Sequence, residues 1–161
     1  MARYDRIHLF RFDNGQDKYD ESCVLERGAQ PATFDLASTD GHTCRIGMSI
    51  CYDLRFPELY CQLRADILLV PSAFTFTTGQ AHWERPLRAR AIENLAFVLA
   101  SAQGGAHEDG RQTCGHSMIV GPWRQILAEH GQDNGVAVAE VAMQTLQTAR
   151  SRLTALNHAV L

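Results

Sequence analysis

Short apolar segments, separated by polar stretches that contain glycine or proline, recur along the chain and predict a series of β-strands. Thr39, Asp40 and Gly41 form a turn signal between two of these segments and predict a hairpin there. Eight segments have the length and pattern of strands: 4–10, 32–37, 43–50, 66–71, 97–102, 117–120, 125–128 and 136–141.

Apolar residues at helical spacing predict three helices. Pro57 fits the first turn of a helix over 57–63, and an amphipathic pattern predicts a last helix over 143–152. Between them, Trp83, Leu87, Ala91 and Leu95 recur at i+4 spacing and predict a helix at about 80–95. Pro86 predicts a kink or a later start of that helix, because proline lacks the N–H that a helix interior needs.

The order of these elements predicts an α/β fold. In the middle of the chain strands alternate with helices, which is typical of a largely parallel sheet layered by helices. The strands that follow are close together and are expected to extend the sheet as hairpins. Because no linker, repeat or low-complexity stretch divides the chain, we expect residues 1–161 to form a single domain.

The composition is that of a globular protein and excludes several functional classes. Of the 161 residues, 45% are apolar and 20% are charged, which argues against a disordered or collagen-like chain. No apolar run approaches the roughly 18 residues of a membrane span, so no membrane partner is expected. The formal net charge of -3 argues against nucleic acid as the main partner.

The cysteines favour a reducing compartment. There are five, an odd number, and the polar start of the chain lacks the pattern of a signal peptide, so the expected location is the cytoplasm. No pair has the CxxC spacing of a structural zinc site, and we expect no bound metal.

Cys51 is the candidate for chemistry. It ends the predicted strand 43–50, and in open α/β sheets ligands bind at the carboxyl ends of the strands. A sharp strand-to-helix turn exposes a nucleophile and leaves backbone N–H groups free to hold an oxyanion. Arg55 and the following helix N-terminus are expected to lower the pKa of the thiol. From position alone, packing is the commoner role of such a cysteine, and the other four are expected in the core.

Several motifs together resemble the carbon–nitrogen hydrolase (nitrilase) superfamily. The segment 50–58, Ile-Cys-Tyr-Asp-Leu-Arg-Phe-Pro-Glu, is similar to its nucleophile motif, and the similarity is strongest to the amidase-type branch of omega-amidases and deaminated-glutathione amidases. Further similar segments occur in the family order: 4–10, 70–74, 82–84, 88–94 and 115–123.

The resemblance implies an α-β-β-α sandwich, of which this chain is expected to form the C-terminal portion, and a Glu-Lys-Cys catalytic set. The thiolate of Cys51 would attack a small amide or nitrile, ammonia would leave, and water would hydrolyse the thioester without any cofactor. The backbone N–H of Tyr52 would help form the oxyanion hole, Asp53 would cap the turn, and Phe74 would line the acyl pocket. Family members pair through a sheet-extending interface, so at least a homodimer is expected.

Two departures from the family pattern bear on catalysis. The position of the family lysine is occupied by Arg6, which keeps the charge but cannot exchange a proton. The general-base glutamate belongs to an upstream part of the fold that these residues do not match. Glu21 matches a further family glutamate that positions substrate or assists the base. The alternative interpretation of Glu21 is a solvated loop carboxylate without a catalytic role.

Three functional hypotheses therefore remain. The first is a cysteine-dependent hydrolase of C–N bonds. The second is a truncated, inactive homologue that acts at most as an assembly partner. An apolar sheet or helix face without its covering layer would then bind a second copy of the chain. The third, a thiol-reactive sensor, ranks last because Cys51 has no second cysteine at redox-motif spacing.

Overall fold

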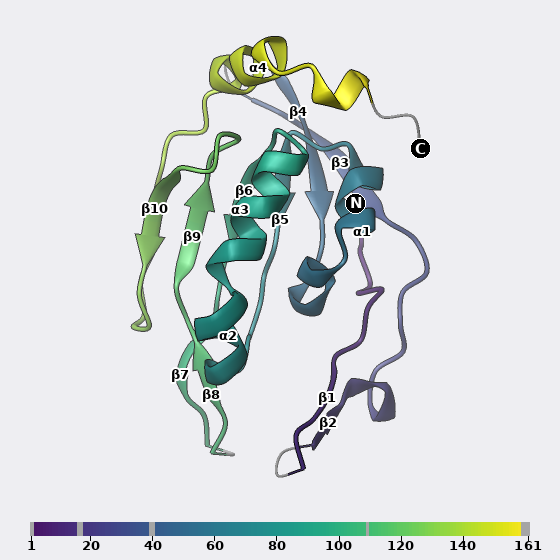
Figure 1. Cartoon of the computed structure of the whole chain (residues 1–161), viewed down its shortest axis with the longest axis vertical. Helices are drawn as coiled ribbons and strands as arrows, with labels where there is room; N and C mark the ends of the chain where they lie inside the picture. Colours follow the sequence, from purple (N-terminus) through teal and green to yellow (C-terminus); the bar gives the residue numbers. More distant parts are fainter. Residues whose placement is uncertain (1, 16–17, 39–40, 109, 159–161) are drawn as a thin grey trace.

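The computed structural model describes residues 2–15, 18–38, 41–108 and 110–158 (Figure 1). Its centre is a six-stranded mixed sheet in the order β10-β9-β6-β5-β4-β3. The three middle strands are parallel and their outer neighbours are antiparallel, as the alternation of strands and helices predicted. The strands are β3 (Ala32–Ala37), β4 (Thr43–Met48), β5 (Ile67–Leu69), β6 (Phe97–Ala100), β9 (Ser117–Val120) and β10 (Ile126–His130).

Two small hairpins lie outside this sheet. Strands β1 (Arg11–Asp13) and β2 (Lys18–Asp20) pair with each other, as do β7 (Gly104–Ala106) and β8 (Gln112–Cys114). Neither pair was predicted, because strands of three residues are too short to show an apolar period. In Figure 1 both hairpins lie at the same end of the molecule.

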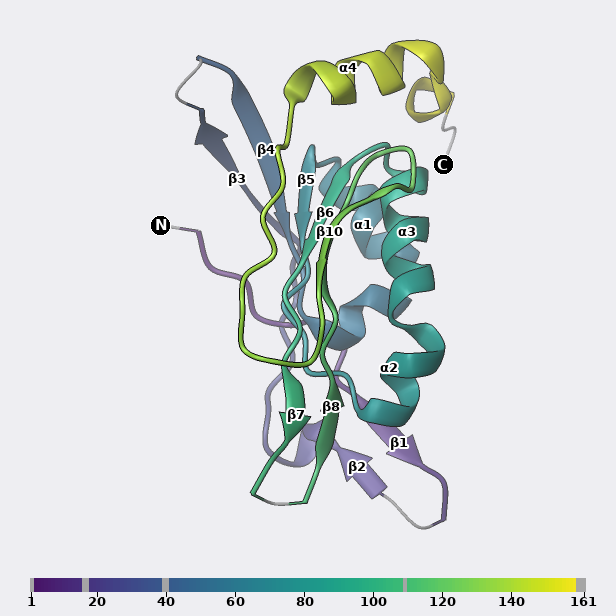
Figure 2. The same ribbon diagram turned by 90° about the vertical axis from the view of Figure 1, so that its left-hand side faces the viewer.

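Three α-helices cover one face of the sheet: α1 (Pro57–Leu63), α2 (Phe76–His82) and α3 (Glu84–Glu93) (Figures 1 and 2). Helix α4 (Met143–Arg152) lies across one end of the sheet, and short 3-10 helices occur at η1 (Glu21–Cys23), η2 (Cys51–Arg55) and η3 (Ala155–Asn157). The helix predicted at 80–95 is two helices that meet at Trp83. Pro86 is the third residue of α3, where its missing N–H would have no acceptor inside the helix.

The two faces of the sheet are covered differently. Leu68, Val98 and Val120 are fully buried beneath the helices. On the opposite face, Ile67 and Phe97 are covered by Leu146 of α4. Because residues alternate between faces along a strand, apolar residues on both sides explain the unbroken apolar runs in these segments.

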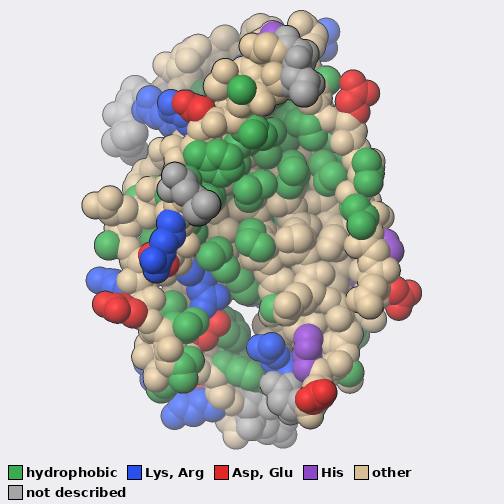
Figure 3. All heavy atoms as spheres, turned by 180° about the vertical axis from the view of Figure 1, so that it is seen from behind, with side chains coloured by type: hydrophobic (Ala, Val, Ile, Leu, Met, Phe, Trp, Pro, Cys, Tyr) green, Lys and Arg blue, Asp and Glu red, His purple; other side chains and the backbone are tan. Residues whose placement is uncertain are grey.

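The rest of the opposite face is open. Figure 3 shows hydrophobic side chains gathered on it, and a cavity of about 540 Å³ lies there. Its walls include Met48, Leu69, Leu99 and Ile119, which are only partly buried, and none of the described residues that line it is charged. The segment 131–142, which leads from β10 to α4, runs along this side of the sheet in Figure 2.

Two of the predicted strands are not strands. Residues 4–10 are irregular and are held by bonds to other loops, among them the Gly28 N–H to the Arg6 carbonyl at 2.8 Å. Residues 136–141 are irregular as well, with Val136 81% exposed and Val138 79% exposed. Both segments have a strand-like pattern, but neither pairs with an adjacent strand through a ladder of backbone hydrogen bonds. The predicted turn at Thr39 and Asp40 lies outside the described residues, between β3 and β4.

Candidate active site around Cys51

Cys51 begins η2, three residues after the end of β4, with a φ of +52°. Its N–H donates to the carbonyl of Pro71 at 2.9 Å. A non-glycine residue in the left-handed region costs on the order of 1–3 kcal/mol, and such residues cluster at functional sites. The prediction that Cys51 lies at the carboxyl end of a central strand, at a sharp turn, therefore agrees with the observed backbone.

Asp53 is the buried residue that holds this turn in place. Its carboxylate accepts a hydrogen bond from the Ile50 N–H at 2.9 Å, which caps η2 as predicted. It also accepts one from the Tyr4 hydroxyl at 2.7 Å. The His8 N–H donates to Asp53 at 3.0 Å, and the Nδ1 atom of the His8 ring lies 2.8 Å from the same carboxylate. Burial, followed by the bond and charge of Asp53, raises the pKa of Tyr4 far above its ordinary value. Asp53 thus joins the N-terminal segment to the Cys51 turn.

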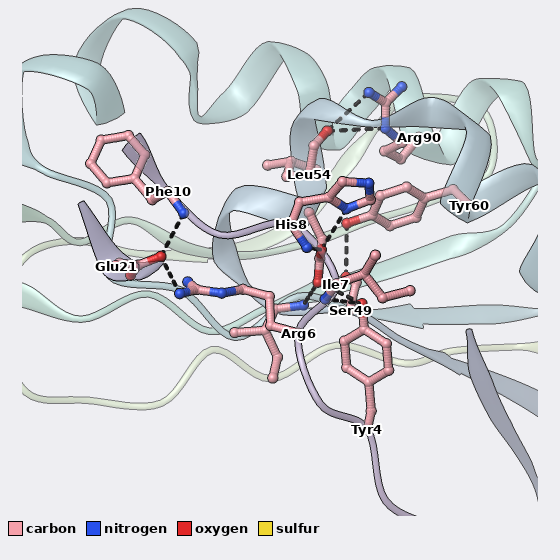
Figure 4. A network of polar contacts seen from close by, with 12 residues as sticks. Tyr4, Arg6, Ile7, His8, Phe10, Glu21, Ser49, Leu54, Tyr60 and Arg90 are labelled. Atoms are coloured by element: carbon pink, nitrogen blue, oxygen red, sulfur yellow. Dashed lines mark hydrogen bonds and ion pairs between the residues drawn. The ribbon is translucent and has the colours of Figure 1, made fainter. Parts of the chain in front are cut away.

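Arg6 and Glu21 form an ion pair beside Cys51. The Glu21 Oε2 atom accepts from the Arg6 guanidinium and, at 2.6 Å, from the Phe10 N–H (Figure 4). The side chains are 11% and 30% exposed, respectively, so Glu21 is not the solvated loop carboxylate that was the alternative. The pair fixes the guanidinium and the carboxylate in one position.

Two cavities share Cys51 and Glu21 as wall residues. The first, the polar cavity of about 510 Å³, is also lined by Arg6. The second, the aromatic cavity of about 260 Å³, is also lined by Tyr52 and Phe74. All five residues selected from the sequence therefore lie around these two cavities, while their chemical roles stay predictions.

Burial raises the pKa of the Cys51 thiol. The Ala73 N–H, the Arg6 charge and the Tyr52 N–H oppose this effect, whereas the Glu21 charge adds to it. The net shift is therefore upward and not the lowering that was expected, because burial outweighs the favourable charges. The Arg55 guanidinium lies 5.7 Å from the ring centres of both Tyr52 and Phe74, and it packs on these rings.

Comparison with known proteins decides the family. The family model described as carbon-nitrogen hydrolase matches residues 1–151. The chain belongs to the carbon–nitrogen hydrolase family. A deaminated glutathione amidase from Synechocystis is 42% identical over 165 residues, which cover 99% of this chain and 59% of that protein. The predicted membership of the nitrilase superfamily, in its amidase branch, is confirmed.

Solved structures confirm the fold class of this carbon–nitrogen hydrolase. The NitFhit protein of Caenorhabditis elegans matches with a TM-score of 0.85 at 40% identity, covering 98% of this chain and 38% of that one. A mutant of the amidase from Nesterenkonia sp. AN1 matches with a TM-score of 0.70 at 29% identity, covering 97% of this chain and 57% of that one. That structure shows Michael addition of acrylamide at the active-site cysteine of that amidase. The chain spans less than two thirds of the length of each of these relatives.

The raised pKa of Cys51 predicts the pH dependence of its alkylation. Only the thiolate reacts, so we expect the rate with iodoacetamide to rise about tenfold per pH unit below the thiol pKa. Because burial raises this pKa, the rate should level off at a higher pH than it does for Cys51 in the urea-unfolded chain. Peptide-level mass spectrometry gives both profiles. An inflection at or below the unfolded value would contradict the effect of burial.

Sequence analysis did not identify all the residues around Cys51. Arg111 lines both cavities, but it lies beside the short strand β8 in a stretch whose pattern predicted no element. The other cysteines differ from expectation as well. Cys44 and Cys114 are buried, as predicted, whereas Cys23 and Cys61 are exposed. An isolated cysteine has no local signal that separates these two outcomes.

The described part of the chain contains neither a metal-binding cluster nor a membrane-spanning helix. No group of three or more His, Cys, Asp or Glu side chains in that part is arranged to hold a metal ion. None of its helices combines the length and the apolar character needed to cross a bilayer.

Proposed function

We propose that this carbon–nitrogen hydrolase cleaves the C–N bond of a small amide, or of a nitrile, through a thioester on Cys51 and releases ammonia. The single observation that carries the proposal is the placement of Cys51 at a strained turn, in the wall of two cavities, beside the Arg6–Glu21 pair. The amidases among its relatives support amide hydrolysis as the reaction class.

The proposed reaction begins with proton transfer, because burial keeps the Cys51 thiol protonated. Glu21 is the candidate base, since it lines both cavities with Cys51. The thiolate then attacks the carbonyl carbon, a C–S bond forms, and the carbonyl electron pair moves to oxygen. Arg6 and the Tyr52 N–H are the candidate donors to this oxyanion.

Collapse of the tetrahedral intermediate breaks the C–N bond, and the leaving nitrogen takes the proton that Glu21 received from Cys51 and departs as ammonia. Water then attacks the thioester and frees the acid and the thiol. Phe74 and Tyr52 line the aromatic cavity, and this lining supports the proposal that the cavity holds the acyl chain. Each step uses protein groups and water alone, so no cofactor is part of the proposal.

Turnover of amides by the 161-residue chain should be slow or absent. Glu21 already accepts two hydrogen bonds, from Arg6 and from the Phe10 N–H, and an impaired acid–base group commonly costs about 10²–10⁴ in rate. Arg6→Lys should raise ammonia release by up to about 10²-fold, because a misplaced oxyanion donor costs on that order. An activated ester such as p-nitrophenyl acetate should still acylate Cys51, because its leaving group needs no proton.

The test measures ammonia release from short amides and the mass of the acylated protein after reaction with the ester. Cys51→Ala should abolish both signals, and Cys61→Ala, at an exposed cysteine on α1, should change neither. Rapid amide hydrolysis by the unmodified chain would refute the argument about Glu21. Activity that survives Cys51→Ala would refute the cysteine mechanism.

The second candidate function is that of an inactive homologue that acts as an assembly partner. The open apolar sheet face favours it, and we propose that a second copy of the chain covers this face. We further propose that residues 1–161 are one carbon–nitrogen hydrolase domain comprising part of the family fold. The free cysteines support a proposed location in the reducing cytoplasm.

A further inference from the structure

The segment that carries Arg6 is attached to Asp53 on both sides of Arg6. Two residues before Arg6, the Tyr4 hydroxyl donates to Oδ2 of Asp53 at 2.7 Å. Two residues after it, the His8 N–H donates to Oδ1 at 3.0 Å, and the Nδ1 atom of the His8 ring lies 2.8 Å from the same oxygen. Arg6 therefore lies between two points of attachment to a single carboxylate.

The same carboxylate holds the turn that presents the thiol. Asp53 is two residues after Cys51, and its Oδ2 atom accepts a hydrogen bond from the Ile50 N–H at 2.9 Å. Asp53 is fully buried, so these bonds form one connected unit inside the protein. The two candidate donors to the oxyanion, Arg6 and the Tyr52 N–H, are thus placed relative to each other through Asp53.

The His8 ring is held by a stacking contact and by a hydrogen bond. It stacks on the Phe56 ring with the centroids 3.7 Å apart and an angle of 7° between the planes. The Phe56 ring in turn meets the Tyr52 ring in a T-shaped contact at 5.5 Å. Because a carboxylate only accepts hydrogen bonds, Nδ1 of His8 carries the proton and donates it to Asp53. The ring is therefore joined to the Cys51 turn at two places.

His8 itself does not face the substrate. It is not among the described residues that line the polar or the aromatic cavity. In Figure 4 the Arg6 side chain extends toward Glu21, whereas the His8 ring points in a different direction. An effect of His8 on the reaction must therefore pass through Asp53.

We propose that His8 is a positioning residue: the hydrogen bond from its Nδ1 atom to Asp53 fixes the candidate oxyanion donors at the spacing that the reaction requires. This role rests on the proposed hydrolysis through Cys51. A donor displaced by about 1 Å can cost on the order of 10²-fold in rate, so loss of this bond should slow the step that forms the oxyanion. Reactions of the thiolate in which no oxyanion forms should keep their rate.

Two reactions of Cys51 separate these cases. With p-nitrophenyl acetate the thiolate sulfur attacks the carbonyl carbon, the carbonyl electron pair moves to oxygen, and the oxyanion collapses with loss of p-nitrophenolate. With iodoacetamide the sulfur forms a bond to the methylene carbon, iodide leaves, and no oxyanion forms. Both rates depend on the same thiolate fraction, so the ratio of acylation to alkylation reports the oxyanion donors. Peptide-level mass spectrometry measures both products.

Substitutions of His8 test which ring nitrogen acts. His8→Gln should lower the ratio by about 10- to 100-fold, because its amide nitrogen takes the place of Nε2 and leaves Asp53 without the Nδ1 donor. His8→Phe keeps a ring that can stack on Phe56 and should lower the ratio in the same way. His8→Asn places an amide N–H near the position of Nδ1 and should keep the ratio close to that of the unmodified chain.

His116→Gln is the matched control. The Nδ1 atom of His116 also lies 2.8 Å from a carboxylate, that of Glu129, but these side chains are 43% and 41% exposed. Neither residue is among the described residues that line the two cavities at Cys51. Its ratio of acylation to alkylation should equal that of the unmodified chain.

The outcomes distinguish the role of His8 from the proposed function. An unchanged ratio in His8→Gln and His8→Phe, an equal fall in His8→Asn, or an equal fall in His116→Gln would overturn the role of His8 alone. An unmodified chain that is alkylated but never acylated at Cys51 would refute the proposed hydrolysis, and the role of His8 with it.

Discussion

Replacing Asp53 with alanine is expected to lower the free energy of unfolding by about 3–5 kcal/mol. Asp53 is fully buried and accepts hydrogen bonds from the Tyr4 hydroxyl and from the N–H groups of His8 and Ile50. Alanine would leave these donors without the acceptor that a fully buried carboxylate provides. Since domains of this size are stable by only about 5–15 kcal/mol, the loss is large.

Urea unfolding followed by circular dichroism measures this change. Asp53→Asn keeps an oxygen acceptor and should lower the free energy of unfolding by less than Asp53→Ala does. Tyr4→Phe removes one hydrogen bond and should lower it by about 1–2 kcal/mol. Asp35→Ala is the matched control, because that side chain is 61% exposed and should change the unfolding free energy by less than about 0.5 kcal/mol. An Asp53→Ala protein as stable as this control would show that the network does not hold the turn.

The same substitution should also alter Cys51. Asp53 fixes the turn through Ile50, and the N-terminal segment that it anchors carries Arg6. Where Asp53→Ala remains folded, the alkylation profile of Cys51 should move toward that of the unfolded chain. Stability and thiol reactivity would then change together in Asp53→Ala, and neither property would change in Asp35→Ala.

Size measurements are expected to show a dimer or larger assembly rather than a particle of 17.9 kDa. The open sheet face carries an apolar cavity of about 540 Å³, and among the residues that the structure describes no charged side chain lines it. Exposed apolar patches of this kind mark interaction sites, and stacked sheets pack about 10 Å apart through such faces. A symmetric pair would bury the same patch on both copies.

Ile119→Glu places a charge on this face and should convert the assembly to monomer in multi-angle light scattering. Val136→Glu tests the same face at a side chain that is already 81% exposed, so its fold should be unaffected. Leu153→Glu is the control, because Leu153 is 41% exposed and follows α4 outside the cavity lining. A wild-type chain that stays monomeric across the concentration range would refute the interface.

Local sequence pattern was sufficient to predict some of the elements. Helices α1 and α4 were predicted with their observed bounds, because Pro57 fits a helix start and the apolar period of 143–152 agrees with helix propensity. The parallel order of β4, β5 and β6 also followed from the alternation of strands with helices. Residues 4–10 and 136–141 show the limit, since a strand also requires a partner that its own sequence does not specify.

The sequence by itself determined the family resemblance, the mixed α/β class and the choice of Cys51, Arg6 and Glu21, because their motifs lie in contiguous stretches. Only the tertiary structure decided that Arg6 and Glu21 are paired, that Arg111 lines both cavities, and that burial raises the pKa of Cys51. The physical reason is that burial and charge depend on which distant segments meet. Arg111 and Cys51 are brought to the same cavities by the pairing of strands that are far apart in the sequence, and no local sequence pattern predicts that placement.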